Sequence, residues 1–295
     1  MKKRPILLAT LTIAGIFLVF LLFALLLGKT GSSPDLVSLG EKIGVIEVLG
    51  PITSSDDLNR EIIEFRDNKS VKAVILRIDS PGGSVGPSQE IYNEVIKLQK
   101  IKPVVVSMGS VAASGGYYIA AAAKQLFANP GTITGSIGVI MSFPNYEQLM
   151  AKVGVSSVVV KSGQFKDIGS GSRPFSDAER KLMQALIDDV HSQFVEAVSL
   201  GREMPAAKVR AIADGRIFSG RQALKAGLID QLGGFQDAVE YTSGLVGLGD
   251  DPKLLYPEVE QPGLIERIIN STLGDIAFEA RQHLTVGPQF LWTGF

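Results

Sequence analysis

The sequence contains no cysteine, and this absence excludes several kinds of site at once. Without thiols the chain cannot form disulfides, use a cysteine nucleophile or bind zinc through cysteine. Histidine is almost as scarce, with only His191 and His283, and neither stands in a recognisable motif. Serine hydrolases usually activate their nucleophile with a histidine. We interpret both histidines as structural, so a serine enzyme built on this chain needs another base.

Neither sign of charge is in excess. The 29 lysines and arginines against 30 aspartates and glutamates leave a net charge of −1. Proteins that bind nucleic acid usually carry a basic excess, so this balance argues against such a partner. The chain of 295 residues is 45% hydrophobic, which is enough for the core of one large domain or two small ones.

A long uncharged run lies near the N-terminus, over residues 6–27. A helix rises about 1.5 Å per residue, so the run can span a hydrocarbon core of roughly 30 Å. A cleaved signal peptide usually has an apolar region of about 7–15 residues and a small-residue cleavage site, and residues 25–29 form a poor one. Lys2, Lys3 and Arg4 precede the run. We therefore expect a single-pass membrane anchor with the N-terminus in the cytoplasm and the rest of the chain outside.

Beyond this run, predicted strands alternate with predicted helices. The strand at 71–78 is almost entirely apolar, as in a sheet that is buried on both faces. The alternation indicates crossover connections, and hence an α/β fold with a mostly parallel sheet and flanking helices. The predicted strands are 43–48, 71–78, 103–106, 139–142 and 157–161, and the predicted helices are 56–68, 88–99 and 112–123.

Two later helices are predicted from the residues that begin them. Ser176 and Glu179 form a capping-box pattern, which predicts a long helix from there to about residue 200. Ser219 repeats the pattern for a short helix that Gly227 ends.

The C-terminal part has a different character. Residues 265–277 outline an amphipathic helix, and residues 288–295 are aromatic and apolar. That last segment fits either a disordered tail or a stretch that packs on a neighbouring chain or a membrane surface. We expect four parts: a cytoplasmic tail and anchor at 1–28, a short flexible linker at 29–41, the main domain at 42–250, and a C-terminal extension of unknown role at 251–295.

Two small-residue turns follow buried strands and could carry chemistry. In the first, Gly82 and Gly83 follow a predicted strand, and glycine amides can aim N–H groups at a developing oxyanion. An ordinary strand-to-helix turn is the alternative. In the second, Ser110 and Ser114 stand among alanines and glycines at the start of a predicted helix, where free N–H groups favour an alkoxide. The alternative is that these serines only cap the helix.

Two further segments could supply a base. Lys166 can act as a general base only if its surroundings lower its pKa from about 10.4 towards neutral. The neighbouring Phe165 and Ile168 favour burial, although a solvated surface lysine is the commoner case. Thr134 and Ser136 lie in a glycine-rich turn, where a hydroxyl could orient a lysine amine or serve only the turn.

Taken together, these segments closely resemble the signal peptide peptidase A family. The similarity runs over roughly residues 42 to 240 in the family's order and spacing, and the single copy is similar to the short form of the family rather than its tandem-repeat form. The segments are DSPGG at 79–83, MGSVAASGGYY at 108–118, TGSIGV at 134–139 and KSGQFKD at 161–167, followed by ADGR at 213–216 and GRQA at 220–223.

The resemblance implies a fold like that of the ClpP and crotonase superfamily. It implies Ser114 as nucleophile, Lys166 as general base, Ser136 as the hydroxyl that orients the lysine, and the amides of Gly83 and Gly115 as the oxyanion hole. It implies no metal or organic cofactor.

The function implied is that of a membrane-anchored serine endopeptidase with a serine–lysine dyad. Its substrates would be remnant signal peptides left after preprotein processing. The catalytic domain would lie outside a bacterial inner or plasma membrane. The chain would also associate with itself into a ring, in which Ser114 of one subunit meets Lys166 of the next.

Three other functions remain open on the sequence. A crotonase-like acyl-CoA enzyme would use paired oxyanion donors on a thioester, and would need neither Ser114 nor Lys166. A non-catalytic membrane scaffold could keep the fold, but the intact pair argues against it. A related family of serine–lysine membrane proteases cuts stomatin-like partners and normally has further membrane spans, which this sequence lacks.

Overall fold

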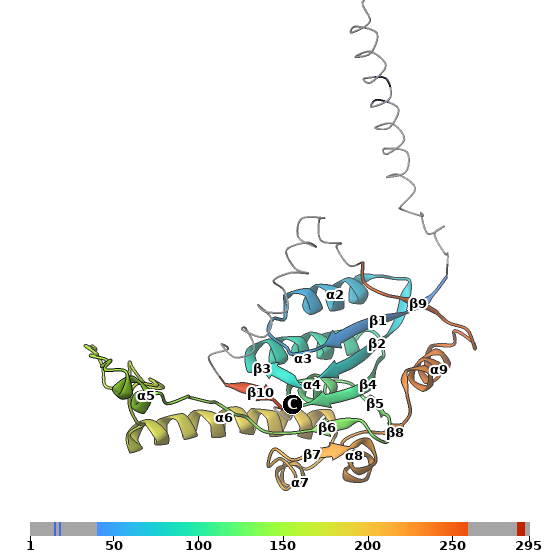
Figure 1. Ribbon diagram of the computed structural model, residues 1–295. Helices are drawn as coiled ribbons and strands as arrows, with labels where there is room; N and C mark the ends of the chain where they lie inside the picture. The colour runs from blue at the N-terminus through green and yellow to red at the C-terminus, as the bar shows by residue number, and fades with distance from the viewer. Residues whose placement is uncertain (1–14, 16–17, 19–39, 259–287, 293–295) are drawn as a thin grey trace, which may run out of the picture. The chain divides into compact units, whose positions relative to one another are not determined.

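The computed structural model describes residues 15, 18, 40–258 and 288–292. The chain divides into two units, Met1–Gly40 and Glu41–Phe295, and the sheet belongs to the second (Figure 1). Across the described residues, no helix is both long enough and apolar enough to cross a membrane. The predicted anchor at 6–27, apart from Gly15 and Leu18, and the predicted helix at 265–277 lie outside the described residues.

The second unit is built on one mixed but mainly parallel sheet, in the order β7-β6-β4-β2-β1-β9, with β5 and β8 joined to it through β4 (Figure 1). The β6–β7 pair is antiparallel, whereas the other pairs of this sheet are parallel. This confirms the predicted α/β class. The strands are β1 (Lys42–Leu49), β2 (Val71–Ser80), β4 (Val104–Ala113), β5 (Gln125–Ala128), β6 (Ile133–Gly135), β7 (Ile217–Ser219), β8 (Gln231–Leu232) and β9 (Lys253–Leu255).

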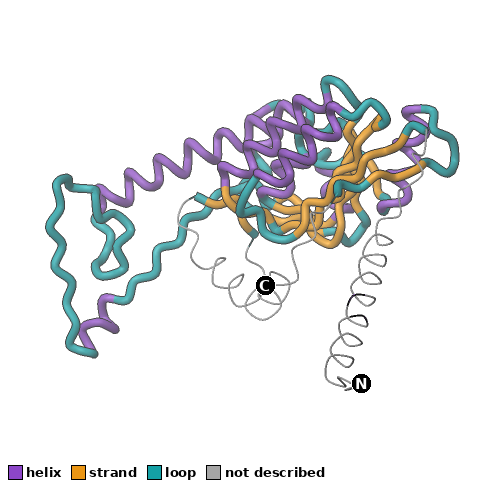
Figure 2. The backbone as a smooth tube through the Cα atoms, turned by 90° about the horizontal axis from the view of Figure 1, so that it is seen from above, coloured by secondary structure: helices purple, strands orange, loops and turns teal. Residues whose placement is uncertain are grey.

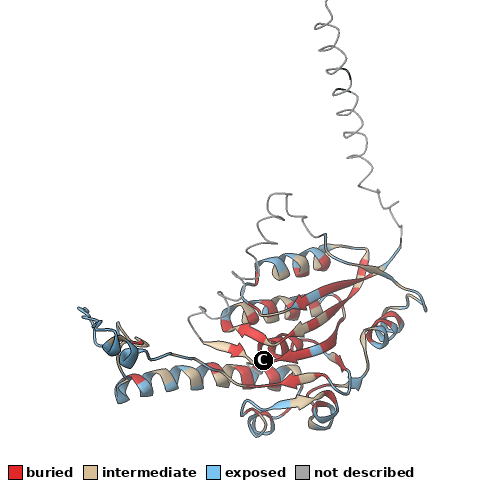
Figure 3. Ribbon diagram, in the orientation of Figure 1, coloured by how far each residue is buried: buried red, intermediate tan, exposed pale blue. Residues whose placement is uncertain are grey.

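Alternate side chains of the central strands face opposite layers, as the pleat requires. One set, including Val74, Leu76 and Val106, packs in the main core with α2 (Asp56–Asp67), α3 (Val85–Gln99) and α4 (Gly115–Ala120). The other set, including Ile75 and Val105, packs against α9 (Phe235–Val246). Both faces of the sheet are therefore buried, as the apolar run at 71–78 predicts (Figure 3).

The predicted elements of the first half are largely confirmed, with one correction where β4 ends. Residues 112 and 113 were expected in a helix, but β4 continues to Ala113 and pairs there with β6. Alanine favours helix locally, but strand pairing outweighs so weak a preference. The helix α4 begins only at Gly115, so Ser114 stands at the junction of strand and helix.

The two predicted capping boxes are present. Ser176 and Glu179 bond reciprocally at the start of α6 (Asp177–Gly201). Ser219 caps α8 (Gly220–Ala226), which ends at Gly227 in the left-handed conformation. A short helix, α7 (Ala206–Arg210), separates the two.

Residues 141–175, called the arm here, leave the sheet and return to it through α6. The arm contains α5 (Glu147–Lys152) and lies beyond the end of α6 that is farther from the sheet (Figures 1 and 2). Within α6, apolar burial begins at Val190, whereas Leu182 and Leu186 are exposed. The arm is joined internally by the Phe143–Phe175 ring contact.

The predicted strands at 139–142 and 157–161 are wrong. Only Ile140 makes an isolated bridge, and residues 157–161 pair with no described strand. Val158 and Val160 are 88% and 97% exposed. β-Branched residues favour strands because they pack on a pleated, half-buried surface, and the described residues provide no such surface against this stretch.

The aromatic C-terminal segment packs within this chain. Residues Gln289–Leu291 form β10, which pairs antiparallel with the short strand β3 (Gly82–Ser84). Phe290 is fully buried between the rings of Tyr118 and Phe194, at centroid distances of 5.0 and 4.6 Å. The described residues of this segment therefore match neither alternative: they are ordered, and they pack on their own chain rather than on a neighbouring chain or a membrane surface.

Candidate active site

Ser114 occupies a strained junction between β4 and α4. Its φ and ψ of 54° and −115° lie where L-residues are rarely found. The backbone is held there by the Ser114 N–H, which donates to the Gly135 carbonyl at 2.8 Å, and by the Ser114 carbonyl, which accepts from the Tyr118 N–H. The hydroxyl does not cap α4. Such strain costs about 1–3 kcal/mol and persists mainly where function requires it, as in strained strand-to-helix turns that carry a nucleophile.

Two backbone amides lie close to this junction. A Cβ atom added to Gly115 would come within 3.1 Å of the Gly83 amide nitrogen, and one added to Gly82 within 2.6 Å of the Gly115 amide nitrogen. Gly82 itself has a φ of 99°. The crowding leaves no room for side chains, so glycine is required here for β3 to approach the Ser114 turn. The structure thus brings together Ser114 and both candidate oxyanion donors, Gly83 and Gly115.

Ser136 directly follows β6, and Ser114 directly follows the neighbouring strand β4. In the parallel pairing of β4 with β6, Ala113 is opposite Gly135, so the next residues of the two strands are Ser114 and Ser136. Ser136 also has a positive φ, of 51°, and its N–H donates to the Arg216 carbonyl at 2.9 Å. Thr134 is tied differently, because its hydroxyl donates to the Ala112 carbonyl at 2.7 Å. The Thr134 hydroxyl is thus engaged, whereas the Ser136 hydroxyl donates to no group among the described residues.

The strand β10 runs past the same amides. A Cβ atom added to Gly82 would meet both the Phe290 carbonyl oxygen and the Gly115 amide nitrogen, so β10 and this amide both lie close to Gly82. On its other side, Gln289 exchanges two backbone hydrogen bonds of 3.1 Å with Ile140. β10 is therefore an extended segment held between β3 and Ile140, antiparallel to both.

Lys166 is not brought to Ser114 within the chain. It lies in the arm, exposed, in a turn closed by its own N–H donating to the Gly163 carbonyl at 3.2 Å. Figures 1 and 2 place the arm beyond the far end of α6, away from β4 and α4. The expected burial by Phe165 is not found, since that side chain is itself exposed. Within one copy of the chain, the structure therefore keeps Ser114 and Lys166 apart.

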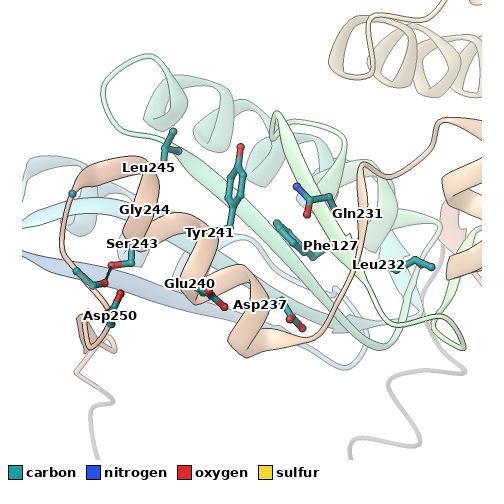
Figure 4. A pocket seen from close by; sticks show the side chains of 12 residues that line it. Phe127, Gln231, Leu232, Asp237, Glu240, Tyr241, Ser243, Gly244, Leu245 and Asp250 are labelled. Atoms are coloured by element: carbon teal, nitrogen blue, oxygen red, sulfur yellow. Dashed lines mark hydrogen bonds between the residues drawn. The ribbon is translucent and has the colours of Figure 1, made fainter.

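A separate cavity of about 690 Å³ lies between β5, β8 and α9 (Figure 4). Its lining includes Asp237, Glu240 and Tyr241, but none of the predicted site residues. The acidic side chains there do not make a metal site, because no group of three metal-ligating side chains occurs among the described residues. The candidate active site is thus the open junction at Ser114 rather than this cavity.

The turn that carries Lys166 is held by an ionic cluster, which the sequence analysis missed. Arg173 donates from Nε to Asp167 Oδ2 at 2.9 Å and from Nη1 to Glu179 Oε2 at 2.9 Å. Lys161 Nζ lies 2.5 Å from Asp167 Oδ1. Hydrogen bonds from Arg173 and the Ser176 backbone lower the pKa of Glu179 to about 2. Those from Arg173 and Lys161 hold the pKa of Asp167 well below its usual value. The alternation of basic and acidic residues over 161–179 was the signal available.

We expect acid to loosen this cluster before it affects the sheet. The pKa of Glu179 falls on folding from its usual 4.5 to about 2, so its stabilising contribution is complete above pH 4.5 and is lost as the pH falls through about 2. Hydrogen exchange, corrected for intrinsic rates, should rise over residues 161–179 in this range while β4 stays protected. Glu179→Gln should show the raised exchange already at neutral pH. Arm exchange that does not change with pH in the wild type would contradict the prediction.

The fold and the site together define a class. A mainly parallel α/β sheet, with a strained serine at a strand-to-helix turn and glycine amides beside it, is an arrangement suited to acyl transfer. Comparison with family models agrees: residues 96–249 match peptidase family S49, and residues 42–133 match Clp protease.

Individual relatives are similar over much of the chain. A Synechocystis sp. protein named as a candidate protease, slr0021, is 46% identical over 230 residues, covering 78% of this chain and 83% of that protein. A candidate signal peptide peptidase SppA of Enterococcus faecium is 41% identical over 61% of this chain, and Protease 4 of Haemophilus influenzae is 38% identical over 71%. The matches cover 53% and 36% of those two proteins. The chain belongs to peptidase family S49 and is a serine protease.

Proposed function

We propose that this protein is a membrane-anchored endopeptidase that uses a Ser114–Lys166 dyad to degrade remnant signal peptides after preprotein processing. The peptidase class follows from the family, and the proposal concerns the dyad, the substrate and the membrane. Membership of the S49 family argues against the crotonase-like acyl-CoA enzyme and the non-catalytic scaffold.

The observation that carries the proposal is the position of β10. An extended segment lies antiparallel along β3, beside the amides of Gly83 and Gly115. Strand addition of this kind binds a peptide through its main chain and reads alternate side chains in pockets. The edge of β3 therefore suits an extended apolar peptide such as a signal-peptide remnant, which would replace β10 when it binds.

The chemistry follows from the groups at the junction. Neutral Lys166 takes the proton of the Ser114 hydroxyl as the oxygen attacks the peptide carbonyl, and the amine later protonates the leaving nitrogen. The amides of Gly83 and Gly115 donate to the oxyanion as it forms. Ser136, beside Ser114, directs the lysine amine towards the nucleophile. No metal or organic cofactor takes part.

The exposed arm supports a dyad shared between subunits. Val155, Val158 and Val160 present apolar surface, and α6 adds Leu182 and Leu186. Large exposed apolar side chains are common where a protein contacts a partner. If the arm packs on the next subunit, it brings Lys166 to that subunit's Ser114. Head-to-tail contacts of this kind close into a ring when the rotation allows.

The membrane assignment rests on the sequence. Residues 6–27 have the length and apolar character of a single span, with basic residues before it. The proposal places the protein in a bacterial inner or plasma membrane. Its N-terminus then lies in the cytoplasm and its catalytic domain outside, where signal-peptide remnants are accessible from the lipid.

Covalent labelling tests the function directly. A fluorophosphonate probe reacts only with an activated serine, and mass spectrometry of the labelled full-length protein should place the adduct on Ser114. Replacement of Lys166 by alanine should prevent labelling, whereas Arg60→Gln, in an exposed ion pair on α2, should not. An adduct on another serine, or labelling that persists without Lys166, would exclude the dyad.

A further inference from the structure

The inference concerns Arg173 and its connection to Lys166. Arg173 makes five hydrogen bonds, and they join two parts of the chain. Its Nε and Nη2 donate to the side chain and carbonyl of Asp167, the residue after Lys166. Its Nη1 and Nη2 donate to the two carboxylate oxygens of Glu179, at 2.9 and 2.5 Å. This bidentate, charge-assisted pairing is the strongest type of hydrogen bond available to side chains.

Glu179 fixes the other end of the connection. Its carboxylate also accepts from the Ser176 N–H at 2.9 Å, so it belongs to the capping box that begins α6. Glu179 is almost completely buried. Asp167, Arg173 and Glu179 connect the Lys166 turn to α6. This helix is anchored in the core from Val190 onward, so it gives the turn a fixed point of attachment.

Other contacts at this turn stay within the arm, such as the close approach of Gly169 to the Phe143 ring. Residues 157–166 are exposed and form no regular element. Lys166 lines a hollow of about 230 Å³ whose described walls all belong to the arm itself, namely Val159, Val160, Lys161, Ser162 and Asp167. No apolar packing against the sheet is present there among the described residues. The ionic connection thus ties the residue next to Lys166 to the start of α6.

The same residues govern the charge around Lys166. Lys161 and Asp167 are the charged residues that line the same hollow as Lys166, and Asp167 is joined in turn to Arg173 and so to Glu179. An unpaired carboxylate next to a lysine favours the protonated amine. Arg173 and Lys161 both pair with Asp167, so this carboxylate is not unpaired in the structure.

We propose that Arg173 is a positioning residue for the peptidase reaction: through Asp167 it presents Lys166 to the active site and keeps the Asp167 carboxylate from holding the lysine amine. This rests on the proposed function of Lys166. Arg173 acts only through Asp167 and Lys166 and takes no part in proton transfer.

The test compares steady-state peptide hydrolysis by full-length Arg173→Gln and Asp167→Asn enzymes over a range of pH. Both should lower kcat by about 10- to 100-fold, because a base displaced by about 1 Å loses that much rate. KM should stay within about two-fold, since the peptide-binding edge is on the sheet. The pH at which activity rises should move upward in Arg173→Gln, where Asp167 is freed. It should move downward in Asp167→Asn, where two cations remain without the carboxylate.

Two further variants separate this role from a loss of folding. Arg173→Lys keeps the positive charge but loses the bidentate hydrogen bonding of the guanidinium. We therefore expect kcat to fall while the pH dependence stays near that of the wild type. Arg60→Gln removes a comparable arginine from an exposed pair and should change neither. If Arg173→Gln fails to fold, two results still test the role of Arg173. Asp167→Asn should shift the pH profile downward, and Arg173→Lys should lower kcat without shifting the profile.

The outcomes distinguish this proposal from the dyad itself. Activity that survives Lys166→Ala would overturn both. An inactive Lys166→Ala enzyme, together with an Arg173→Gln enzyme of normal kcat and unchanged pH dependence, would overturn the positioning role alone. Shifts of the Arg173→Gln and Asp167→Asn pH profiles in the same direction would also overturn it. Such a result would indicate a general structural disturbance, whose effect on the pH profile does not depend on the sign of the charge removed.

Discussion

Replacing Ser114 by alanine is expected to abolish peptide hydrolysis while the enzyme folds and assembles normally. Loss of the nucleophile of a serine protease costs on the order of 10⁶ in kcat. Folding should not suffer, because the hydroxyl makes no capping bond and alanine meets the same backbone strain at this position. Hydrolysis of a quenched fluorescent peptide by the full-length protein measures the loss, and gel filtration in detergent checks assembly.

Ser110→Ala is the matched control for this substitution. Ser110 lies four residues earlier on the same strand, but its side chain is exposed and its backbone is extended in β4. It has neither the strained junction nor the neighbouring amides of Gly83 and Gly115. Ser110→Ala should therefore keep normal activity. An inactive Ser110→Ala enzyme together with an active Ser114→Ala enzyme would show that Ser110, and not Ser114, is the nucleophile.

The central sheet could be predicted because its strands carry their own signal. The run at 71–78 is apolar enough to be buried on both faces, and β2 has Val74, Leu76 and Ile75 facing opposite layers. The capping boxes at Ser176 and Ser219 are equally local, since each depends on residues three positions apart. Such features need no knowledge of the rest of the fold.

The predictions that failed concern segments whose structure depends on partners distant along the chain. The stretch at 157–161 has β-branched residues but no described strand beside it, so it stays irregular. β10 forms because residues 289–291 meet β3 some 200 positions earlier, which no local pattern reveals. The site divides in the same way. The small-residue turns pointed to Gly83 and to Ser110 or Ser114, and only the family resemblance singled out Ser114, Gly83 and Gly115, which the fold brings together.

Lys166 shows what a single chain leaves incomplete. Its motif predicts a base, yet in one copy of the chain it is exposed on the arm, away from Ser114. A general base must come within hydrogen-bond reach of the proton that it removes. The burial that would lower its pKa must then come from whatever covers the arm. Both requirements are met if the covering surface is the Ser114 junction of another subunit.

Mixed assemblies of two inactive variants are therefore expected to regain activity. Ser114→Ala and Lys166→Ala subunits, unfolded and refolded together or co-expressed with different tags, would form interfaces in which an intact Ser114 faces an intact Lys166. For random head-to-tail mixing at equal amounts, about one site in four is complete. Peptide hydrolysis should thus rise from background to about a quarter of the wild-type rate per site.

The control is a mixture of Ser114→Ala with a Ser114→Ala, Lys166→Ala double variant, in which every interface lacks the nucleophile. It should stay inactive at any ratio, and so should each variant refolded alone. Varying the ratio sharpens the test, because activity should be greatest at equal amounts and fall on either side as the product of the two fractions. If hybrids recovered by tandem tag purification prove inactive, both dyad residues must come from one chain, and the arm would have to fold back onto its own sheet.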